Sequence, residues 1–139
     1  MAANTQFSIA LHLMVGLALS DGEVTSRMLA HSVNTNPGFV RRTLAKLSKA
    51  GLVQTTTGNE GACRIARQPR KITLLEIYRA VNAPAAFAIH SYAVQKKCPI
   101  SANIKPAQEK ILGRAQKALE VHLANTTLSD LVDKVRRRK

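Results

Sequence analysis

The sequence predicts a mainly α-helical fold with one small β-hairpin. At 139 residues the chain is long enough for one domain with a hydrophobic core and an appended helix, but short for two full domains. Hydrophobic residues make up 45% of it, with three Phe, two Tyr and no Trp, which favours a core of aliphatic side chains on helices. Apolar residues recur at helical spacing, and one glycine-rich turn joins two short β-like segments.

Residues 5–19 predict a first helix that is apolar around most of its circumference. Phe7, Leu11 and Met14 lie on one helical face, and other apolar residues fill the neighbouring face, so we expect the central core helix here. The apolar run Ile9–Leu19 is shorter than the roughly 20 residues that a membrane span requires, and it lacks the basic start of a signal peptide. We therefore expect a cytoplasmic protein with no membrane partner.

A short second helix is predicted for residues 26–33. Thr25 is a good N-cap, and Met28, Leu29 and Val33 form the expected inward side. In a helix-turn-helix this is the positioning helix, which crosses the DNA backbone.

The most informative stretch, NTNPGFVRRTLAKLSKAG, occupies residues 34–51. Val40, Leu44 and Leu47 recur at i, i+4 and i+7 and predict a third helix with one apolar face. The opposite and flanking faces are basic, which indicates that one side serves a core and the other an anion. The basic residues are Arg41, Arg42, Lys46 and Lys49.

Both ends of this third helix are marked in the sequence. Asn36 is a candidate N-cap, Pro37 suits the first helical position, and Gly51 suits the left-handed residue that ends a helix. The segments 52–56 and 63–66 then flank a glycine-rich tip and predict a hairpin. A basic helix followed by a small hairpin is the outline of a winged helix-turn-helix.

The formal net charge is +13, from 21 Lys and Arg against 8 Asp and Glu, and the excess is unevenly placed. Residues 1–35 sum to −1, whereas residues 36–73 and residues 74–139 each sum to +7. Such a surface attracts polyanions, and double-stranded DNA is the foremost candidate because neutralising its phosphates releases counterions. A non-specific nucleic-acid-binding protein, architectural or RNA-binding, is the alternative.

In a winged helix-turn-helix the third helix enters the major groove. We expect Arg41 and Arg42 to make bidentate contacts to guanine, whereas Lys46 and Lys49 reach phosphates or are merely solvated. Asn59, at the hairpin tip, is expected to lie along the minor groove. Arg64 and Arg67 are expected to bind phosphates beside the wing. The alternative for Thr43 is a side chain that points partly inward. The full set of expected DNA-binding residues is Asn36, Pro37, Gly38, Arg41, Arg42, Thr43, Lys46, Lys49, Asn59, Arg64 and Arg67.

A basic connector at residues 67–71 leads to a fourth helix. Thr73 and Glu76 have the spacing of a capping box, in which each side chain accepts a free backbone N–H. The predicted helix runs to about Val81. The segment 85–101 has weak periodicity and predicts a helix fragment followed by a loop.

The longest helical signal covers residues 104–124. Such a helix lies outside an already complete winged helix and has an apolar stripe without an obvious partner in its own chain. We therefore expect it to pair with the same helix of a second chain, making a homodimer; folding back onto its own domain is the alternative. The expected dimerisation residues are Ile104, Ile111, Leu112, Ala115, Ala118 and Leu119.

A last short helix is predicted before the basic C-terminal tail. Thr127 and Asp130 can cap its start. We therefore divide the chain into a winged helix-turn-helix domain over residues 1–83 and a second part over residues 84–139, which comprises a linker, the dimerisation helix and the C-terminal helix.

Two cysteines, Cys63 and Cys98, are too few for a disulfide framework. Cys98 follows two lysines, whose charge favours the reactive thiolate, so it is a candidate redox sensor. Cys63, on an expected wing strand, is a second candidate, and a structural role is the alternative for both. The sequence has no metal-ligand spacing, nucleophile–base pair or phosphate-binding glycine loop, so we expect neither a metal site nor an enzyme.

With these motifs placed, the sequence resembles the Rrf2 family of bacterial winged-helix transcriptional regulators, which includes the iron–sulfur regulator IscR and the nitric-oxide sensor NsrR. The resemblance covers nearly the whole chain and rests on the blocks NPGFVRRTLAKLSKAGLV, GNEGACRIAR, ITLLEIYRAV and CPI…TLSDLV. It implies a cytoplasmic homodimer that binds an inverted-repeat operator, most often as a repressor, with the long helix crossing its mate.

Within that family the chain resembles the YwnA-type branch, which lacks a cluster. Cluster-binding relatives carry three closely spaced cysteines before the long helix, whereas this chain has one, Cys98. The resemblance thus implies no iron–sulfur cofactor, with ligation by Cys98 and His90 of a dimer as the alternative. A small effector of unknown nature is expected near His90. Relatives often have Glu where this chain has Arg41 and Arg where it has Thr57, so their operator preference is not carried over.

Overall fold

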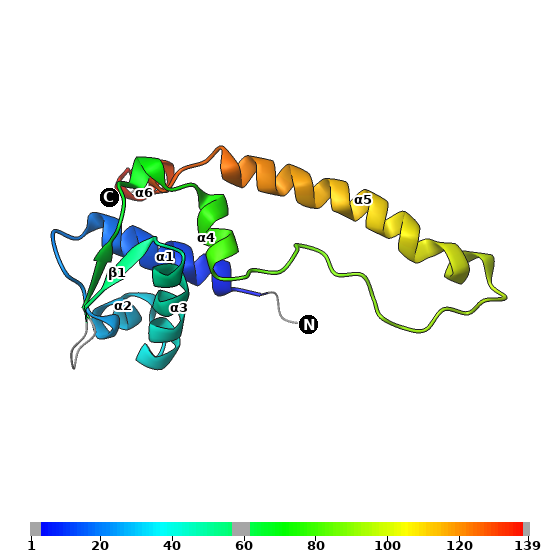
Figure 1. Cartoon of the computed structure of the whole chain (residues 1–139), viewed down its shortest axis with the longest axis horizontal. Coiled ribbons are helices and arrows are strands. Elements are labelled where there is room, and N and C mark those ends of the chain that lie inside the picture. Colours follow the sequence, from blue (N-terminus) through cyan, green and yellow to red (C-terminus); the bar gives the residue numbers. More distant parts are fainter. Residues whose placement is uncertain (1–3, 57–61, 138–139) are drawn as a thin grey trace. The chain divides into compact units, whose positions relative to one another are not determined.

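A computed structural model describes residues 4–56 and 62–137 of the chain. The chain forms two compact units, residues 1–83 with 123–139, and residues 84–122. The expected mainly helical fold with one small antiparallel sheet is confirmed (Figure 1). The elements are α1 (Gln6–Leu19), α2 (Ser26–Val33), α3 (Pro37–Lys49), β1 (Val53–Thr55), β2 (Cys63–Ile65), the 3-10 helix η1 (Pro69–Lys71), α4 (Leu74–Ala80), α5 (Pro99–Ala124) and α6 (Leu128–Arg136).

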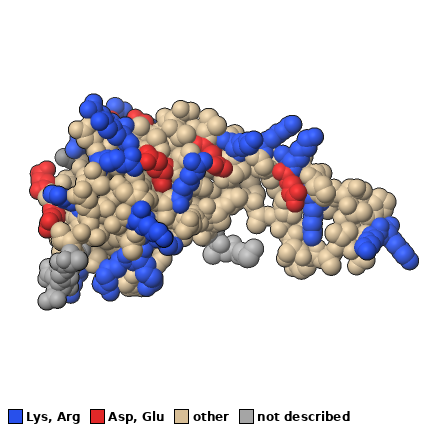
Figure 2. Space-filling view, in the orientation of Figure 1, with Lys and Arg blue, Asp and Glu red and all other residues tan. Residues whose placement is uncertain are grey.

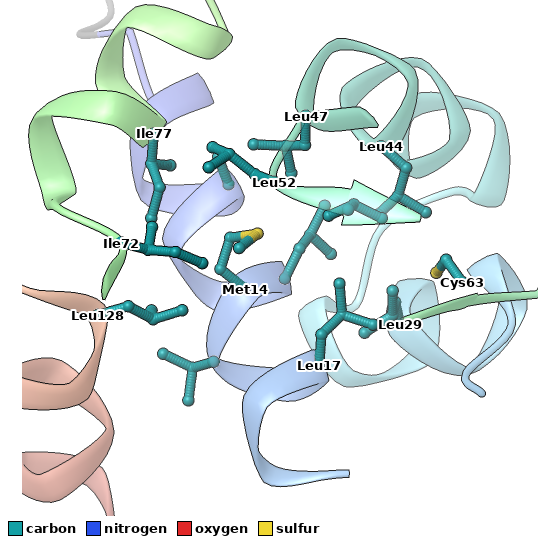
Figure 3. Packing of buried hydrophobic residues seen from close by; sticks show 14 of the residues in the cluster. Met14, Leu17, Leu29, Leu44, Leu47, Leu52, Cys63, Ile72, Ile77 and Leu128 are labelled. Carbon is teal, nitrogen blue, oxygen red and sulfur yellow. The ribbon is translucent and has the colours of Figure 1, made fainter. Parts of the chain in front are cut away.

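Helix α1 is the centre of the first unit, as its apolar circumference predicts. Ala10, Leu13 and Met14 are completely buried, and α1 contacts α2, α4, α6 and β2. Leu44 and Leu47 of α3 point into the same interior (Figure 3). The apolar face of α3 is thereby fixed against the core, which leaves its basic face outward.

Helix α2 has the predicted cap but a different inward side. The Thr25 hydroxyl accepts a hydrogen bond from the Met28 backbone N–H at 3.1 Å. Met28, however, is 57% exposed, whereas Ser26, Leu29 and Ala30 are at most 4% exposed. The buried side therefore starts at Ser26 and follows the i, i+3, i+4 spacing, and Met28 falls outside it. The buried side of α2 thus includes Ser26 in place of the expected Met28.

Helix α3 has the predicted boundaries. The Asn36 side-chain oxygen accepts from the Phe39 backbone N–H at 2.8 Å, and Gly51 has a φ of +79°. Leu52 N–H donates to the Leu47 carbonyl at 3.0 Å, which is the long-range bond of a Schellman motif. Both leucines are completely buried, so the motif turns the chain directly from α3 into the first wing strand.

Strands β1 and β2 form the expected hairpin, with Thr55 opposite Cys63. Cys63 also exchanges two backbone hydrogen bonds with Val24, each 2.8 Å long. The base of the wing is therefore tied to the turn that precedes α2. The tip at residues 57–61, including the expected contact residue Asn59, lies outside the described residues.

Helix α6 belongs to the first unit, which differs from the expected division at residues 84–139. Leu128 N–H donates to the Ile72 carbonyl at 2.8 Å, and Leu74 N–H donates to the Thr126 carbonyl at 2.9 Å. Leu128 is completely buried in the winged-helix core. The sequence did not indicate this packing because the paired segments are far apart along the chain.

The second unit consists of an irregular segment and α5. Residues 84–98 contain no helix, so the expected helix fragment is wrong. Helix α5 begins at Pro99 rather than at residue 104, since proline suits the first helical position. The Ser101 backbone N–H lies 3.5 Å from the Cys98 sulfur. Across the described ranges, no helix is both long and apolar enough to cross a membrane.

Candidate DNA-binding site

The outward face of α3 gathers guanidinium groups at the start of the helix. Arg41 and Arg42 are both exposed. A Cβ atom built on Gly38 would lie 3.3 Å from Asn36 Oδ1, 3.7 Å from Arg42 Nη1 and 3.8 Å from Arg41 Nη2. The glycine therefore leaves a small space between the capping residue and two cations. Half-buried Pro37 precedes it as the first helical residue.

Arg42 is oriented by an aromatic side chain that sequence reasoning did not single out. Its Cζ atom lies 5.9 Å from the centroid of the Phe39 ring, a distance at which a guanidinium is attracted to the face of the ring. Phe39 is half-buried, so it is anchored on one side. Its position three residues before Arg42 on a helix was the signal that could have predicted the pair.

Thr43 does not lie on this face, which corrects its place among the expected contact residues. It is 2% exposed, and its hydroxyl donates to the Phe39 carbonyl at 3.1 Å. A threonine that bonds the carbonyl four residues back satisfies its hydroxyl inside the helix and can turn its methyl group inward. Thr43 is therefore a core residue.

Further cations flank α3 on the helix and on the wing. Lys49 is exposed and Lys46 is half-buried. On β2, Arg64 is exposed and its Nε donates to Gln54 Oε1 at 3.0 Å. This cross-strand pair holds the guanidinium on the surface of the hairpin, where its five donors can serve an anion as well as Gln54.

Arg67, one of the expected phosphate-binding residues, forms an ion pair with Glu76. Its Nη2 lies 2.6 Å from Glu76 Oε2, and Glu76 completes the predicted capping box with Thr73. Burial raises the pKa of Glu76, but the hydrogen bonds from Arg67 and Thr73 and the charge of Arg67 outweigh it and lower that pKa. The pair joins the end of the wing to the start of α4.

Lys and Arg dominate the charged residues on the visible face in Figure 2, with few Asp and Glu among them. Such a charge distribution favours polyanion binding through counterion release.

The second unit exposes apolar side chains along one side of α5. Ile100 is 73% exposed, Ile104 37% and Ile111 68%. The expected dimerisation residues divide between two sides of the helix. Ala115 and Ala118 are exposed on the isoleucine side, whereas Leu112 and Leu119 are half-buried. A continuous exposed apolar stripe of this kind is typical of an interface.

The two cysteines have opposite environments. Cys63 is 1% exposed, its sulfur donates to the Val24 carbonyl at 3.1 Å, and burial followed by the charge of Glu23 raises its pKa to about 11. Cys98 is exposed. Since the thiolate is the reactive form, Cys98 is the more accessible target for oxidants and alkylating reagents.

Comparison with known proteins decides the family. The family model Rrf2, described as an iron-dependent transcriptional regulator, matches residues 3–134. The chain belongs to the Rrf2 family. Its Bacillus subtilis relative YwnA is 35% identical over 131 residues, which cover 94% of this chain and 96% of YwnA. The resemblance seen in the sequence is thereby confirmed.

Solved structures agree with this Rrf2 assignment. A protein from Lactobacillus plantarum superposes with a TM-score of 0.78 at 27% identity, covering 96% of this chain and 91% of that one. CymR, the global cysteine regulator of Bacillus subtilis, superposes with a TM-score of 0.70 at 23% identity, covering 96% and 98%. At that identity the likeness to CymR shows the fold alone.

The description of the family model names iron, so the possible metal ligands of this Rrf2 chain are considered next. Within the described residues no group of three or more His, Cys, Asp or Glu side chains could hold a metal ion. Iron–sulfur clusters need several thiolates, whereas Cys63 is buried and hydrogen-bonded inside the winged-helix unit. Cys98 is the other cysteine of the sequence.

Proposed function

We propose that this Rrf2 protein is a homodimeric transcriptional repressor that recognises an inverted-repeat operator in double-stranded DNA. The proposal rests on the geometry of α3. The apolar face of this helix is buried in the core, and Arg42 lies over the Phe39 ring on its outward face. A guanidinium held in this way suits bidentate contact with the O6 and N7 atoms of guanine in the major groove. Family membership supports the same function at the level of transcriptional regulation.

The homodimer is supported by the apolar stripe on α5. Ile100, Ile104 and Ile111 lie on one side of that helix and are exposed. If the same helix of a second chain covers these side chains, association gains about 25 cal/mol of free energy for each Å² of apolar surface removed from water. A two-fold dimer presents two recognition helices, which is why we propose an inverted repeat as the operator.

We propose further that the protein works without an iron–sulfur cluster and without catalysis, and that it acts in the cytoplasm, where bacterial chromosomal DNA lies. The donor set argues against a cluster, as described above. Reconstitution with iron and sulfide under anaerobic conditions tests this point, since a cluster shared through Cys98 and His90 of a dimer would give visible charge-transfer absorption. A small effector near His90 stays a prediction.

A thiol response at Cys98 is the finer part of the proposal. Its exposure supports attack of the thiolate on hydrogen peroxide, which gives the sulfenic acid and releases hydroxide. Cys63 is an unsuitable sensor because its raised pKa of about 11 leaves little thiolate. Operator binding should therefore respond to peroxide through Cys98 or not at all.

The experiment that tests the function is selection of genomic DNA fragments by the purified full-length chain, followed by sequencing. One palindromic motif is the expected result. Arg42→Ala should lose about 1–3 kcal/mol of discrimination at one position of each half-site. The control, Lys134→Ala, removes one exposed cation from α6 and should keep the motif.

A non-specific nucleic-acid-binding protein is the second candidate, favoured by the net charge of +13. It predicts strong salt dependence with no recovered motif. Equal effects of Arg42→Ala and Lys134→Ala on every DNA fragment would favour this candidate and contradict base reading by Arg42.

A further inference from the structure

Helix α5 has two different sides in the second unit. On one side, three polar side chains bond backbone groups of the irregular segment 84–98. They are Ser101, which accepts from the Gln95 N–H at 2.8 Å, Lys105, which donates to the Tyr92 carbonyl, and Gln116, which accepts from the Ala86 N–H at 3.0 Å. The other side is the exposed apolar stripe that contains Ile104 and Ile111.

Gln108 lies at the border of these two sides, and its amide oxygen bonds neither. At 3.6 residues per turn it is about 40° around the helix from Ile104 and about 60° from Lys105. Its Oε1 atom is buried and has no hydrogen-bond partner among the described residues. A buried carbonyl without a donor is costly, and such groups in native proteins nearly always find a partner. Because this oxygen holds no bond in the isolated chain, the amide can turn to a new partner without losing one.

The spacing of Gln108 makes it a member of the apolar stripe. Counted from Ile104, successive steps of four, three, four and three residues reach Gln108, Ile111, Ala115 and Ala118. These five residues form a seam of the kind along which two helices pack, because each member returns to the same side of the helix. Gln108 places one amide in a seam that is otherwise aliphatic. A polar residue at such a position weakens association but specifies how the two helices align.

We propose that Gln108 pairs with the partner's Gln108 at the point where the two α5 helices of the homodimer cross. The inference rests on the homodimer of the proposed function. The other seam residues are isoleucines and alanines, whose side chains carry no donor, so within the seam a second Gln108 is the one side chain that can satisfy the first. Residues on a two-fold axis meet their own copy, and an amide, which has both a donor and an acceptor, is self-complementary there.

The amide pair fixes the register of the homodimer. If one α5 helix slid along the other by a turn, each Gln108 would be buried against aliphatic side chains without a partner, at a cost in free energy. The apolar residues of the seam supply association, and Gln108 selects one alignment. A fixed alignment suits a protein that reads two half-sites at a set separation.

Disulfide scanning along the seam tests the pair in the full-length chain. Each variant carries Cys98→Ser and keeps Cys63, which is 1% exposed. The scanned substitutions are Ile104→Cys, Gln108→Cys, Ile111→Cys and Ala115→Cys. A disulfide needs Cα atoms within about 7 Å, and the seam neighbours of Gln108 lie about 4.5–6 Å from the crossing point along each helix. With oxidised glutathione, Gln108→Cys should therefore form covalent dimers about tenfold faster than the other three. Gly113→Cys, on the opposite side of α5, should not cross-link.

A second variant, Gln108→Leu, tests the role of the amide itself. Light scattering should still give a dimer, with an equal or lower dissociation constant, because leucine suits an aliphatic seam. Cross-linking through Ile104→Cys and through Ile111→Cys should become roughly tenfold faster in this background, since the helices then slide past each other. Gly113→Leu is the matched control and should leave both rates unchanged. Far-UV circular dichroism checks the fold of every variant.

The outcomes separate this pair from the homodimer. Fastest cross-linking at another seam position, or equal rates at all of them, would overturn the pair and leave the homodimer standing. Unchanged cross-linking rates in Gln108→Leu would overturn the register role. A wild-type chain that is monomeric by light scattering would refute the proposed homodimer, and the Gln108 pair with it.

Discussion

The Arg67 guanidinium Nη2 lies 2.6 Å from Glu76 Oε2, and this ion pair joins the wing to helix α4. The other carboxylate oxygen of Glu76 accepts a hydrogen bond from the Thr73 backbone N–H at 3.1 Å. One side chain therefore caps a helix and holds the residue that ends the wing. The Glu76 side chain thereby joins the end of the wing to the start of α4.

This geometry predicts an acid-sensitive contribution to stability. The pKa of Glu76 in the folded protein lies below its usual value of 4.5, so the contribution is complete above that value and is lost as the pH falls through the folded pKa. Relative to Glu76→Gln, wild type should lose on the order of 0.5 kcal/mol in acid, a small amount because the side chain is 39% exposed. Urea unfolding at neutral pH and below pH 4.5 measures it. Parallel pH profiles of the two proteins would contradict the assignment.

A second prediction concerns the ring that orients Arg42. Phe39→Leu keeps an apolar anchor but removes the aromatic face 5.9 Å from the guanidinium carbon. Operator affinity should fall about two- to fivefold, the value of an exposed cation–π contact, while the unfolding midpoint changes little. Fluorescence anisotropy with labelled operator measures the affinity. In an Arg42→Ala background the same substitution should have no further effect, and an additive loss would show that Phe39 acts by another route.

Self-association should depend on the exposed stripe of α5. Ile111→Asp places a charge on a side chain that is 68% exposed in the isolated chain, and we expect the dimer to dissociate while far-UV circular dichroism stays unchanged. Gly113→Asp is the matched control, because it adds the same charge roughly 200° around the helix at a position where a Cβ meets no atom within 4 Å. Light scattering coupled to size-exclusion chromatography gives the mass. A dimeric Ile111→Asp protein would exclude this stripe as the interface.

The cysteines should differ sharply in thiol reactivity. In the native protein a maleimide should modify Cys98, which is exposed, and leave Cys63, which is 1% exposed and whose pKa is raised to about 11. Cys98→Ser should abolish the fast phase, and Cys63→Ser should keep it. Mass spectrometry of tryptic peptides identifies the modified residue. Rapid labelling of Cys63 would mean that the wing opens easily.

Helix α6 should contribute strongly to the stability of the winged helix. Leu128→Ala removes a side chain with 0% exposure and should cost about 2–5 kcal/mol of unfolding free energy. Val135→Ala on the same helix is the control, since Val135 is 45% exposed and should be nearly neutral. Denaturant unfolding compares the two. Equal small losses would contradict the packing of α6 described here.

Local chemistry explains what the sequence could predict. The caps at Thr25, Asn36 and Thr73 and the left-handed turn at Gly51 depend on residues within one helical turn of each other, and each is present as expected. The recognition helix followed by the hairpin was predictable for the same reason, since its apolar spacing lies within a single segment.

Contacts between distant segments explain what the sequence missed. Arg67 was assigned to DNA because nothing nearby indicated that Glu76 would bind its guanidinium. Met28 was placed inside because it is apolar, whereas the packing selected Ser26. Thr43 had an inward orientation as its alternative, and the bond from its hydroxyl to the Phe39 carbonyl agrees with that alternative. In each case a partner or a face was decided by tertiary packing, which residue type alone does not encode.

The return of the chain at α6 has a consequence for synthesis. The chain leaves the winged-helix unit after residue 83 and returns to it at residue 123. The unit is therefore complete only when residues 123–137 are present. On the ribosome, where folding proceeds from the N-terminus, helix α1 and the segment η1 therefore lack the wall that α6 supplies until α5 has already been translated. A fragment ending at residue 83 would expose the surface that Leu128 covers. The core of the winged helix is thus completed only after the whole of α5 has been synthesised.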